Sequence, residues 1–392
     1  MTANSEPFWI RMPRILIGTG AVENVGELAK KFGGRKVLIV TDPGVVQAGL
    51  VDKVKQPLEK EGIEFGIFDG CEPDVPIHIV KKCAQFAKDG GYDFMISVGG
   101  GSTLDTGKVA SIVATAEDIA QEDISQYIAT GAPRRGLPRI HIPTTSGSGA
   151  DVSLGSPVTD VDGAKKVVFG EYLLPEVAII DPLMTLNLPA RITADTGIDA
   201  LCHAIEGYTS IKANVVSDML SETVIRLVAD NLRLAYCKGS KNLEARHNMA
   251  IAASLAIHCV LTSSAVLPHG MGHSLQSEVK CTHAVSCSIM LPHVMEFNLL
   301  VDQPKYARMA ELMGERVEGL SLRDAARKAV EAVRKLTIDL GIPQRLRDIG
   351  MKKEQIPRVV DILFTPVNVW RVNNNPRDCS REDAARIFEA AW

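Results

Sequence analysis

The amino-acid sequence predicts an α/β domain with a parallel, doubly wound sheet, followed by an all-α domain. Short β-branched runs alternate with longer helical patterns through the first half, and strand signals nearly vanish after Pro182. The length of 392 residues suits two domains of ~150 to 200 residues better than one core. We place the boundary near Leu188-Pro189 and expect domains over residues 1–188 and 189–392, with a cleft between them.

Hydrophobic patterning predicts the individual elements of the first half. Strands are expected over residues 37–40, 65–68, 94–98, 140–142 and 177–180, and helices over residues 45–61, 77–88 and 103–116. A hairpin is expected over residues 157–169, with its turn at Asp162-Gly163. In a parallel sheet of this kind, ligands bind at the carboxyl ends of the strands.

The second half has the pattern of consecutive helices. From Ala194 onwards, apolar residues recur at spacings of three and four, as in Met219, Thr223 and Leu227. No internal repeat or low-complexity linker interrupts the chain. We therefore expect the two domains to pack directly on each other.

Composition and charge exclude several classes of partner. The formal net charge is -4, and no stretch concentrates Lys and Arg with interleaved aromatic residues, so nucleic acid is not an expected partner. The first eight residues lack the basic head and apolar run of a signal peptide, and no apolar stretch reaches membrane-spanning length. We expect a cytoplasmic protein with no membrane partner.

The eight cysteines are scattered without any C-x-x-C pair, and most lie in apolar periodic segments. Structural zinc clusters normally show paired cysteines at short spacing. Buried free thiols are therefore expected, rather than disulfides or a cysteine-based zinc site.

A glycine-rich loop follows the strand predicted at residues 94–98. Gly99, Gly100, Gly101 and Ser102 place backbone amides at a strand end and at the start of a helix, an arrangement that binds phosphate. The Rossmann pattern G-x-G-x-x-G is absent, because Leu104 stands where its third glycine would be. A glycine run alone also fits a simple tight turn.

Two further segments favour a nucleotide at the same edge of the sheet. Thr144 and Thr145 follow the strand at residues 140–142 and offer hydroxyls and amides. Asp42 ends the first predicted strand, where a carboxylate can accept both ribose hydroxyls and repel a 2′-phosphate, which favours NAD over NADP. Before Pro43-Gly44, Asp42 also fits an ordinary turn residue.

The helical half contains a group of potential metal ligands. Asp199 and His203 are four residues apart, which places both on one face of a helix, and His269 and His273 repeat this spacing. His283 follows ten residues later, so four of the nine histidines belong to the group. A single histidine is more often a hydrogen-bonded core residue than a ligand, but the grouping favours a metal site.

Asp199, His203, His269 and His283 would supply one oxygen and three nitrogen ligands, which suit Fe²⁺, Zn²⁺, Co²⁺ or Mn²⁺. Gly270 follows His269, so the glutamate base of an H-E-x-x-H peptidase is missing. The remaining histidines have no equivalent pairing and are expected to be structural: His78, His141, His247, His258 and His293.

These motifs, taken together, resemble the iron-containing (group III) alcohol dehydrogenase family, which includes lactaldehyde reductase and 1,3-propanediol dehydrogenase. The resemblance covers nearly the whole chain. It rests on VTDPGVVQAGLVDKV, SVGGGSTLDTGK, IPTTSGSGADV, TGIDALCHAIEGYTS, LPHGMGH, LPHVMEFN, NNPR and REDAARIFEAAW.

The resemblance implies a Rossmann-like dinucleotide-binding domain, an all-helical domain in a dehydroquinate synthase-like architecture, and catalysis between them. It implies that NAD is contacted by Asp42, Gly99, Gly100, Gly101, Ser102, Thr144, Thr145 and Lys165. It implies that the metal, expected to be Fe²⁺ with Zn²⁺ as an alternative, is held by Asp199, His203, His269 and His283. His273 is not a ligand in such proteins but lies close to the reacting centre. A homodimer or larger homo-oligomer is also implied.

The implied reaction is hydride transfer between NAD and a small alcohol or its aldehyde, with the metal as Lewis acid. His273 would relay the alcohol proton or only shape the pocket wall. Two other functions fit parts of the pattern: a metal- and NAD-dependent lyase similar to dehydroquinate synthase, and a non-catalytic NAD-sensing protein. The identity of the alcohol is not encoded in these motifs.

Overall fold

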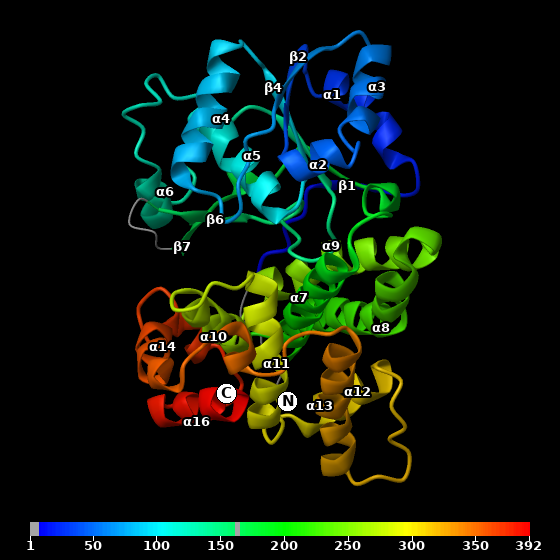
Figure 1. The fold of residues 1–392 in the computed structure, drawn as a ribbon, viewed down its shortest axis with the longest axis vertical. Coiled ribbons are helices and arrows are strands. Elements are labelled where there is room, and N and C mark those ends of the chain that lie inside the picture. The colour runs from blue at the N-terminus through cyan, green and yellow to red at the C-terminus, as the bar shows by residue number, and fades with distance from the viewer. Residues whose placement is uncertain (1–7, 161–164) are drawn as a thin grey trace. The chain divides into compact units, whose positions relative to one another are not determined.

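The computed structural model describes residues 8–160 and 165–392, which form two compact units (Figure 1). The α/β unit holds Arg11–Thr145 and Gly149–Leu188. The helical unit holds Pro189–Trp392, together with residues 8–10 and the short segment Ser146–Ser148.

The α/β unit is built on a six-stranded sheet in the order β1-β8-β5-β4-β2-β3, in which every neighbouring pair is parallel. Its strands are β1 (Arg14–Ile17), β2 (Lys36–Val40), β3 (Glu64–Phe68), β4 (Phe94–Gly99), β5 (Arg139–Pro143) and β8 (Val177–Ile180). Strands β6 (Gly155–Thr159) and β7 (Lys165–Phe169) form the predicted antiparallel hairpin. Its expected turn at Asp162-Gly163 lies outside the described residues.

Helices cover both faces of this sheet. They are α1 (Val25–Lys31), α2 (Pro43–Gln47), α3 (Asp52–Lys60), α4 (Ile77–Asp89), α5 (Gly101–Val113) and α6 (Ile124–Thr130). Successive side chains of β2 point to opposite faces, so Val37 and Ile39 join one core with α1 and α3, while Leu38 and Val40 join another with α4 and α5. The predicted doubly wound α/β fold is confirmed.

The order of the strands creates a switch point between β2 and β4. From β2 the chain moves outward to β3, whereas from β4 it moves in the opposite direction to β5. Connections that leave neighbouring strands in opposite directions open a crevice at their carboxyl ends. Asp42 follows β2 and Gly100 follows β4, so both lie at this crevice.

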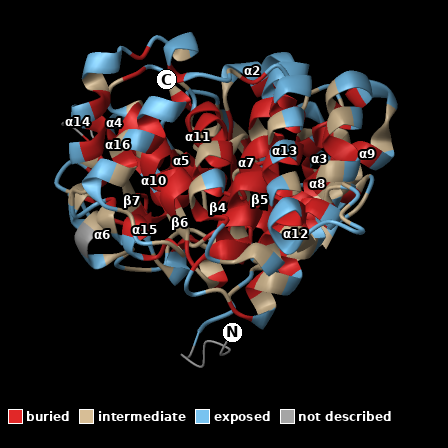
Figure 2. Cartoon of the chain, turned by 90° about the horizontal axis from the view of Figure 1, so that it is seen from below, coloured by how far each residue is buried: buried red, intermediate tan, exposed pale blue. Residues whose placement is uncertain are grey.

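The helical unit consists of ten α-helices and has no strand over residues 189–392, all of which are described. The helices are α7 (Ala190–Thr209), α8 (Val215–Lys238), α9 (Leu243–Thr262), α10 (Leu267–Gln276), α11 (His283–Asn298), α12 (Gln303–Leu312), α13 (Leu322–Asp339), α14 (Ile356–Leu363), α15 (Val369–Asn373) and α16 (Arg381–Ala391). Helix α7 packs against α8, α9 and α11 and is buried over most of its length (Figure 2).

Two hydrophobic cores meet at helix α11. Leu291 and Met295 of α11 belong to a core with α7, α8, α9, α12 and α13. Ile289 and Val294 belong to a second core with α10, α14 and α16. Side chains at the start of α11 are therefore fixed by both cores.

The sequence patterns missed three elements and merged two others. Strand β1 and helices α1 and α6 were not predicted, and the helix expected over residues 45–61 is divided into α2 and α3. Gly49 has φ of 70° in the turn between them, a backbone conformation that ends a helix.

No single helix among the described residues is long and apolar enough to cross a membrane. The bent pair α9 and α10, with 103° between the two helices, passes the same test of length and composition when taken together.

A buried ion pair ties helix α5 to the hairpin. Lys108 Nζ lies 2.8 Å from Asp105 Oδ1 and donates to Ser153 Oγ and to the Gly155 carbonyl, each at 2.9 Å. The Lys108 side chain is fully buried, and burial raises the pKa of Asp105 to about 6. The α/β unit therefore contains an ion pair that is shielded from water.

Replacing Lys108 with Met leaves the Asp105 carboxylate buried without its cation. We expect the free energy of unfolding to fall by about 3 to 5 kcal/mol, measured by urea denaturation followed by circular dichroism at neutral pH. Lys55→Met is the matched control, because Lys55 pairs with Asp52 at the same i,i+3 spacing in solvent. Equal losses in the free energy of unfolding in the two variants would show that burial of the Lys108–Asp105 pair adds nothing to its contribution to stability.

Candidate metal centre

One face of helix α7 carries the first part of the site. Asp199, His203 and Glu206 follow one another at spacings of four and three residues, which places them on the same side of the helix. All three are buried, and Glu206 is fully inaccessible to solvent. The spacing of Asp199 and His203 was recognised from the sequence, whereas Glu206 was not.

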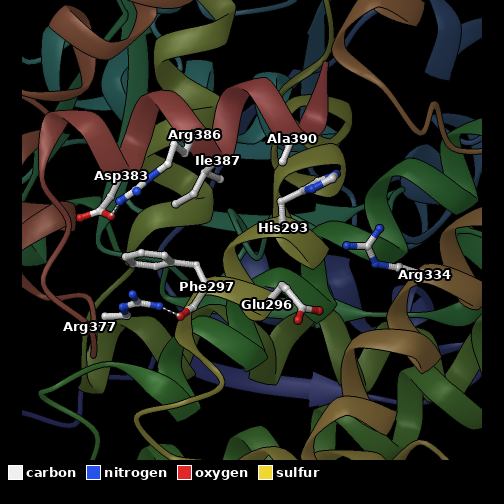
Figure 3. Close-up of a pocket in the computed structure, with 9 residues that line it drawn as sticks. All are labelled: His293, Glu296, Phe297, Arg334, Arg377, Asp383, Arg386, Ile387 and Ala390. Atoms are coloured by element: carbon white, nitrogen blue, oxygen red, sulfur yellow. Dashed lines mark hydrogen bonds and ion pairs between the residues drawn. The ribbon is translucent and has the colours of Figure 1, made fainter.

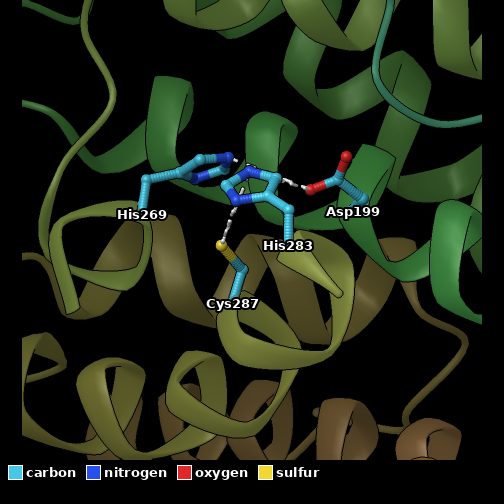
Figure 4. Close-up of side chains that lie close together, drawn as sticks. All are labelled: Asp199, His269, His283 and Cys287. Carbon is cyan, nitrogen blue, oxygen red and sulfur yellow. Dashed lines mark hydrogen bonds and ion pairs between the residues drawn. The ribbon is translucent and has the colours of Figure 1, made fainter. Parts of the chain in front are cut away.

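Helices α10 and α11 bring two imidazoles to this face. Pro268 occupies the first turn of α10, where a proline fits without losing a hydrogen bond, and His269 follows it. His283 is the first residue of α11, whose N-terminus is capped by the Thr282 side chain. His269 Nε2 and His283 Nε2 each lie 3.9 Å from Asp199 Oδ1 (Figure 4).

The other ring nitrogen of each histidine faces an oxygen atom. His269 Nδ1 forms a short contact with Glu206 Oε1, and His283 Nδ1 lies 3.2 Å from Gln276 Oε1. When Nδ1 donates to such an oxygen, the lone pair is on Nε2, the atom that faces Asp199. Both imidazoles are therefore oriented as metal ligands normally are.

Glu206 is itself held in place at the start of α10. Its Oε2 accepts a hydrogen bond of 2.6 Å from the backbone N–H of Val266, the N-cap residue of this helix, a position whose N–H has no acceptor within the helix. Burial raises the pKa of Glu206 to about 8 and lowers that of His269 to about 3. Because burial disfavours charge on both, the imidazole of His269 is neutral, as a metal ligand requires.

The buried donor atoms fit a divalent cation. Asp199 Oδ1, His269 Nε2 and His203 Nδ1 have no hydrogen-bond partner among the described residues. Each buried polar atom left unpaired costs about 1 to 3 kcal/mol. Burial raises the pKa of Asp199, but the adjacent His203, His283 and His269 outweigh it and lower the pKa overall. An anionic oxygen among imidazole nitrogens is a ligand set for Fe²⁺ or Zn²⁺.

The donor atoms of the four predicted ligands do not all lie equally close to one another. Asp199, His269 and His283, together with Cys287, have donor atoms that all lie within 4.8 Å of one another. His203 is not in this group of four, but its ring is stacked on that of His269, with 4.6 Å between the ring centroids. The structure thus gathers all four predicted ligands and adds a cysteine that the sequence analysis treated as a core thiol.

His273 lies one turn beyond His269 on helix α10 and is partly exposed. Its ring meets that of His283 edge to face, with 5.0 Å between the centroids and 86° between the planes. The imidazole is therefore beside the cluster. It is not in the group of close donor atoms.

The predicted nucleotide residues gather on the α/β unit at the carboxyl ends of three adjacent strands. Thr103 Oγ1 donates to Asp42 Oδ2 at 2.8 Å, joining the loop after β2 to the helix after β4. Thr144 N–H donates to the Gly99 carbonyl at 2.9 Å, joining the loop after β5 to the last residue of β4. The three loops predicted to bind NAD therefore form one hydrogen-bonded edge.

The glycine run opens helix α5 slightly earlier than predicted. Gly100 is the N-cap, and Gly101 and Ser102 form the first turn. A side chain at residue 99 would place Cβ 2.5 Å from Thr103 Cβ, so only glycine fits there. Amides at this helix start are thus left bare, as a phosphate site requires.

Lys165 reaches the same edge through Asp74. Lys165 Nζ lies 2.6 Å from Asp74 Oδ1, and the Asp74 backbone N–H donates to Ser102 Oγ at 3.2 Å. Asp74 therefore links the lysine to the residue that follows the glycine run. Asp42 also caps α2, with Oδ1 accepting from the Val45 N–H at 3.1 Å, so the turn-residue interpretation of Asp42 holds as well.

A cavity of about 390 Å³ lies elsewhere on the helical unit, among α11, α13 and α16 (Figure 3). His293, predicted to be structural, lines it, and burial lowers the pKa of His293 to about 4. Arg377 donates to the Phe297 carbonyl, and Asp383 pairs with Arg386. None of the predicted site residues lines this cavity.

Family models match both parts of the chain. The model for iron-containing alcohol dehydrogenase matches residues 13–182, and the model for the C-terminal part of the Fe-containing alcohol dehydrogenase family matches residues 193–392. The chain belongs to the iron-containing alcohol dehydrogenase family. This confirms the resemblance inferred from the motifs, and it favours the dehydrogenase over the lyase considered beside it.

Individual members of the family are similar to this chain over almost its full length. It is similar to 1,3-propanediol dehydrogenase of Klebsiella pneumoniae, with 39% identity over 379 residues and 96% of each chain covered. It is similar to a solved 1,3-propanediol oxidoreductase, with a TM-score of 0.93, 37% identity, and 99% of this chain and 100% of that one covered. A sulfoacetaldehyde reductase from Bifidobacterium kashiwanohense, solved in complex with NAD⁺, has a TM-score of 0.87 at 25% identity, with 99% of each chain covered.

Glu206→Ala should weaken metal binding roughly 10- to 100-fold, because His269 loses the oxygen that orients its ring. Glu206→Gln keeps an oxygen at that position and should therefore lose less metal affinity than Glu206→Ala. Affinity is measured by competition with a chromophoric chelator. The control is Glu222→Ala. Glu222 lies on α8, and its carboxylate accepts a hydrogen bond from Tyr208, which is on α7 as Glu206 is. Unchanged affinity in Glu206→Ala, or equal losses in Glu206→Ala and the control, would contradict this role.

Proposed function

We propose that this protein is an NAD(H)-dependent, divalent-metal alcohol dehydrogenase that interconverts a small alcohol and its aldehyde or ketone. The observation that carries the proposal is the set of buried, unpaired donor atoms around Asp199 in a member of the iron-containing alcohol dehydrogenase family. Fe²⁺ is the expected ion, and Zn²⁺ suits the same donors.

Asp199, His203, His269 and His283 are the proposed ligands. When bound, the metal supplies Lewis acidity toward the alcohol oxygen, and NAD⁺ supplies the acceptor for the hydride. Asp199 contributes the negative charge, and the imidazoles contribute neutral nitrogens, so the ligand set leaves a net positive charge to polarise a substrate. Glu206 and Gln276 hold His269 and His283 in the required orientation.

The proposed NAD site uses the hydrogen-bonded edge of the sheet. Bare amides of Gly99, Gly100, Gly101 and Ser102 would bind the pyrophosphate, with the hydroxyls of Thr144 and Thr145 and the Lys165 ammonium nearby. Asp42 would accept the adenosine ribose hydroxyls. Each of its oxygens already accepts one hydrogen bond and keeps a further lone pair for this purpose.

The substrate class is proposed from the relatives. Their names specify 1,3-propanediol and sulfoacetaldehyde, so short diols and short aldehydes with a second polar group are the first compounds to test. Cytoplasmic location and assembly into a homodimer or larger oligomer remain predictions from the sequence.

Metal-dependent NADH formation tests the activity. Chelator-stripped protein is mixed with NAD⁺ and a panel of small alcohols that includes 1,3-propanediol, before and after anaerobic addition of Fe²⁺ or Zn²⁺. We expect NADH absorbance only after the metal is added, and a slower reaction with NADP⁺ because Asp42 repels its 2′-phosphate. The absence of signal with every metal, in both directions of reaction, would refute the proposed activity.

His273 is proposed to relay the alcohol proton, because an imidazole titrates near neutral pH and this ring lies beside His283. His273→Ala should lower kcat by roughly 10²- to 10⁴-fold while the metal content stays unchanged. His269→Ala is the comparison, since it should lose the metal as well. If His273→Ala loses metal and rate in equal measure, His273 is a ligand and not a proton relay.

A further inference from the structure

Cys287 lies within the cluster of metal-ligand atoms. It is one turn beyond His283 on helix α11, and its side chain is fully buried. Its Sγ lies 3.8 Å from His283 Nε2 and 3.9 Å from His283 Nδ1, and Figure 4 shows it directed at this imidazole. The same i,i+4 spacing joins Asp199 and His203 on helix α7.

The distances between Cys287 Sγ and the neighbouring donor atoms are close to those between ligands of a single metal ion. Donor atoms around a tetrahedral zinc ion lie roughly 3.3 to 3.8 Å apart, given the usual metal–ligand bond lengths. Here Cys287 Sγ is 3.8 Å from His283 Nε2, which is 3.9 Å from Asp199 Oδ1. The sulfur, the carboxylate oxygen and the nitrogens of His269 and His283 are all within 4.8 Å of one another. After small shifts, the sulfur can therefore join the four proposed ligands, Asp199, His203, His269 and His283, as a fifth ligand of the same ion.

The sulfur is held in this position by helix α10. A side chain at Gly272 would place its Cβ 2.6 Å from Cys287 Sγ, so the absence of a side chain there makes room for the sulfur. Asp199 Oδ1 and His269 Nε2, each on a side chain more than nine-tenths buried, have no hydrogen-bond partner among the described residues. A cation that satisfies them would lie within reach of Sγ.

We propose that Cys287 contacts the metal of this site and that its sulfur shifts the preference of the site toward Zn²⁺ over Fe²⁺. Thiolate sulfur is a soft ligand and favours zinc over harder ions. On binding, a sulfur–metal bond forms, the S–H bond breaks, and the proton is released to solvent. This inference rests on the proposed metal site of the dehydrogenase.

The test uses metal-free, full-length protein loaded with Co²⁺ and followed by absorption spectroscopy. A thiolate bound to Co²⁺ gives a sulfur-to-metal charge-transfer band, which oxygen and nitrogen ligands alone do not give. We expect this band in the natural protein and its loss in Cys287→Ser. The control is Cys202→Ser, because Cys202 is an equally buried thiol on helix α7 that is outside the group of close donor atoms. The control should keep the band.

A competition between Zn²⁺ and Fe²⁺ under anaerobic conditions gives the second readout. The ratio of zinc to iron bound should fall at least tenfold in Cys287→Ser and stay unchanged in Cys202→Ser. An unchanged ratio in Cys287→Ser overturns the proposed preference. Even if a variant does not fold, the presence or absence of the charge-transfer band in the natural protein shows whether sulfur binds the metal.

Failure of this inference differs from failure of the metal site itself. If Co²⁺ binds and its ligand-field bands disappear in Asp199→Asn, but no charge-transfer band is seen, the metal site stands and Cys287 is not a ligand. If Co²⁺ does not bind, or binds equally well to Asp199→Asn, the metal site and this inference are both overturned.

Discussion

The burial of the Asp199 carboxylate among imidazoles is the constraint on which the helical unit depends. A carboxylate that is almost wholly removed from water, with one oxygen unpaired, is costly unless a cation neutralises it. Helix α7 presents this group on a face that is covered by α10 and α11, and these two helices supply His269 and His283. The fold thus creates an unfavourable arrangement that a divalent cation makes favourable.

The surrounding residues serve to keep that arrangement fixed. Glu206 of α7 is tied to α10 at two points, since one oxygen contacts His269 and the other accepts from the N-cap residue of α10. Helix α11 is packed into both cores of the helical unit, which fixes His283 at its start. The nucleotide edge of the α/β unit is organised by a separate set of hydrogen bonds, between Asp42 and Thr103 and between Gly99 and Thr144. The two sets of contacts lie in different units of the chain.

Local sequence patterns were sufficient to predict most of the fold and to single out the residues proposed as metal ligands. β-branched runs such as residues 37–40 form strands because both faces of a parallel strand are buried. The spacing of Asp199 and His203 predicted one helix face, which the structure has. By contrast, strand β1 is stabilised by its pairing with β8, more than 150 residues away in the sequence. A local sequence pattern cannot indicate so distant a partner.

The rest of the site depended on contacts between helices. Glu206 lies seven residues after Asp199, so the spacing was available, but a lone glutamate in a helix gives no sign that His269 will meet it. Gln276 and Cys287 became neighbours of His283 only through the packing of α10 against α11. In the sequence, Cys287 is one of eight scattered cysteines and has the pattern of a core thiol.

We propose that one divalent metal ion is bound around Asp199. The most direct test is X-ray diffraction from crystals of the metal-loaded protein, with anomalous data collected at the absorption edge of the bound metal. We expect one strong peak about 2.0 to 2.3 Å from Asp199 Oδ1, His269 Nε2 and His283 Nε2. A protein that carries one metal ion per chain but shows its anomalous peak away from these atoms would contradict this account.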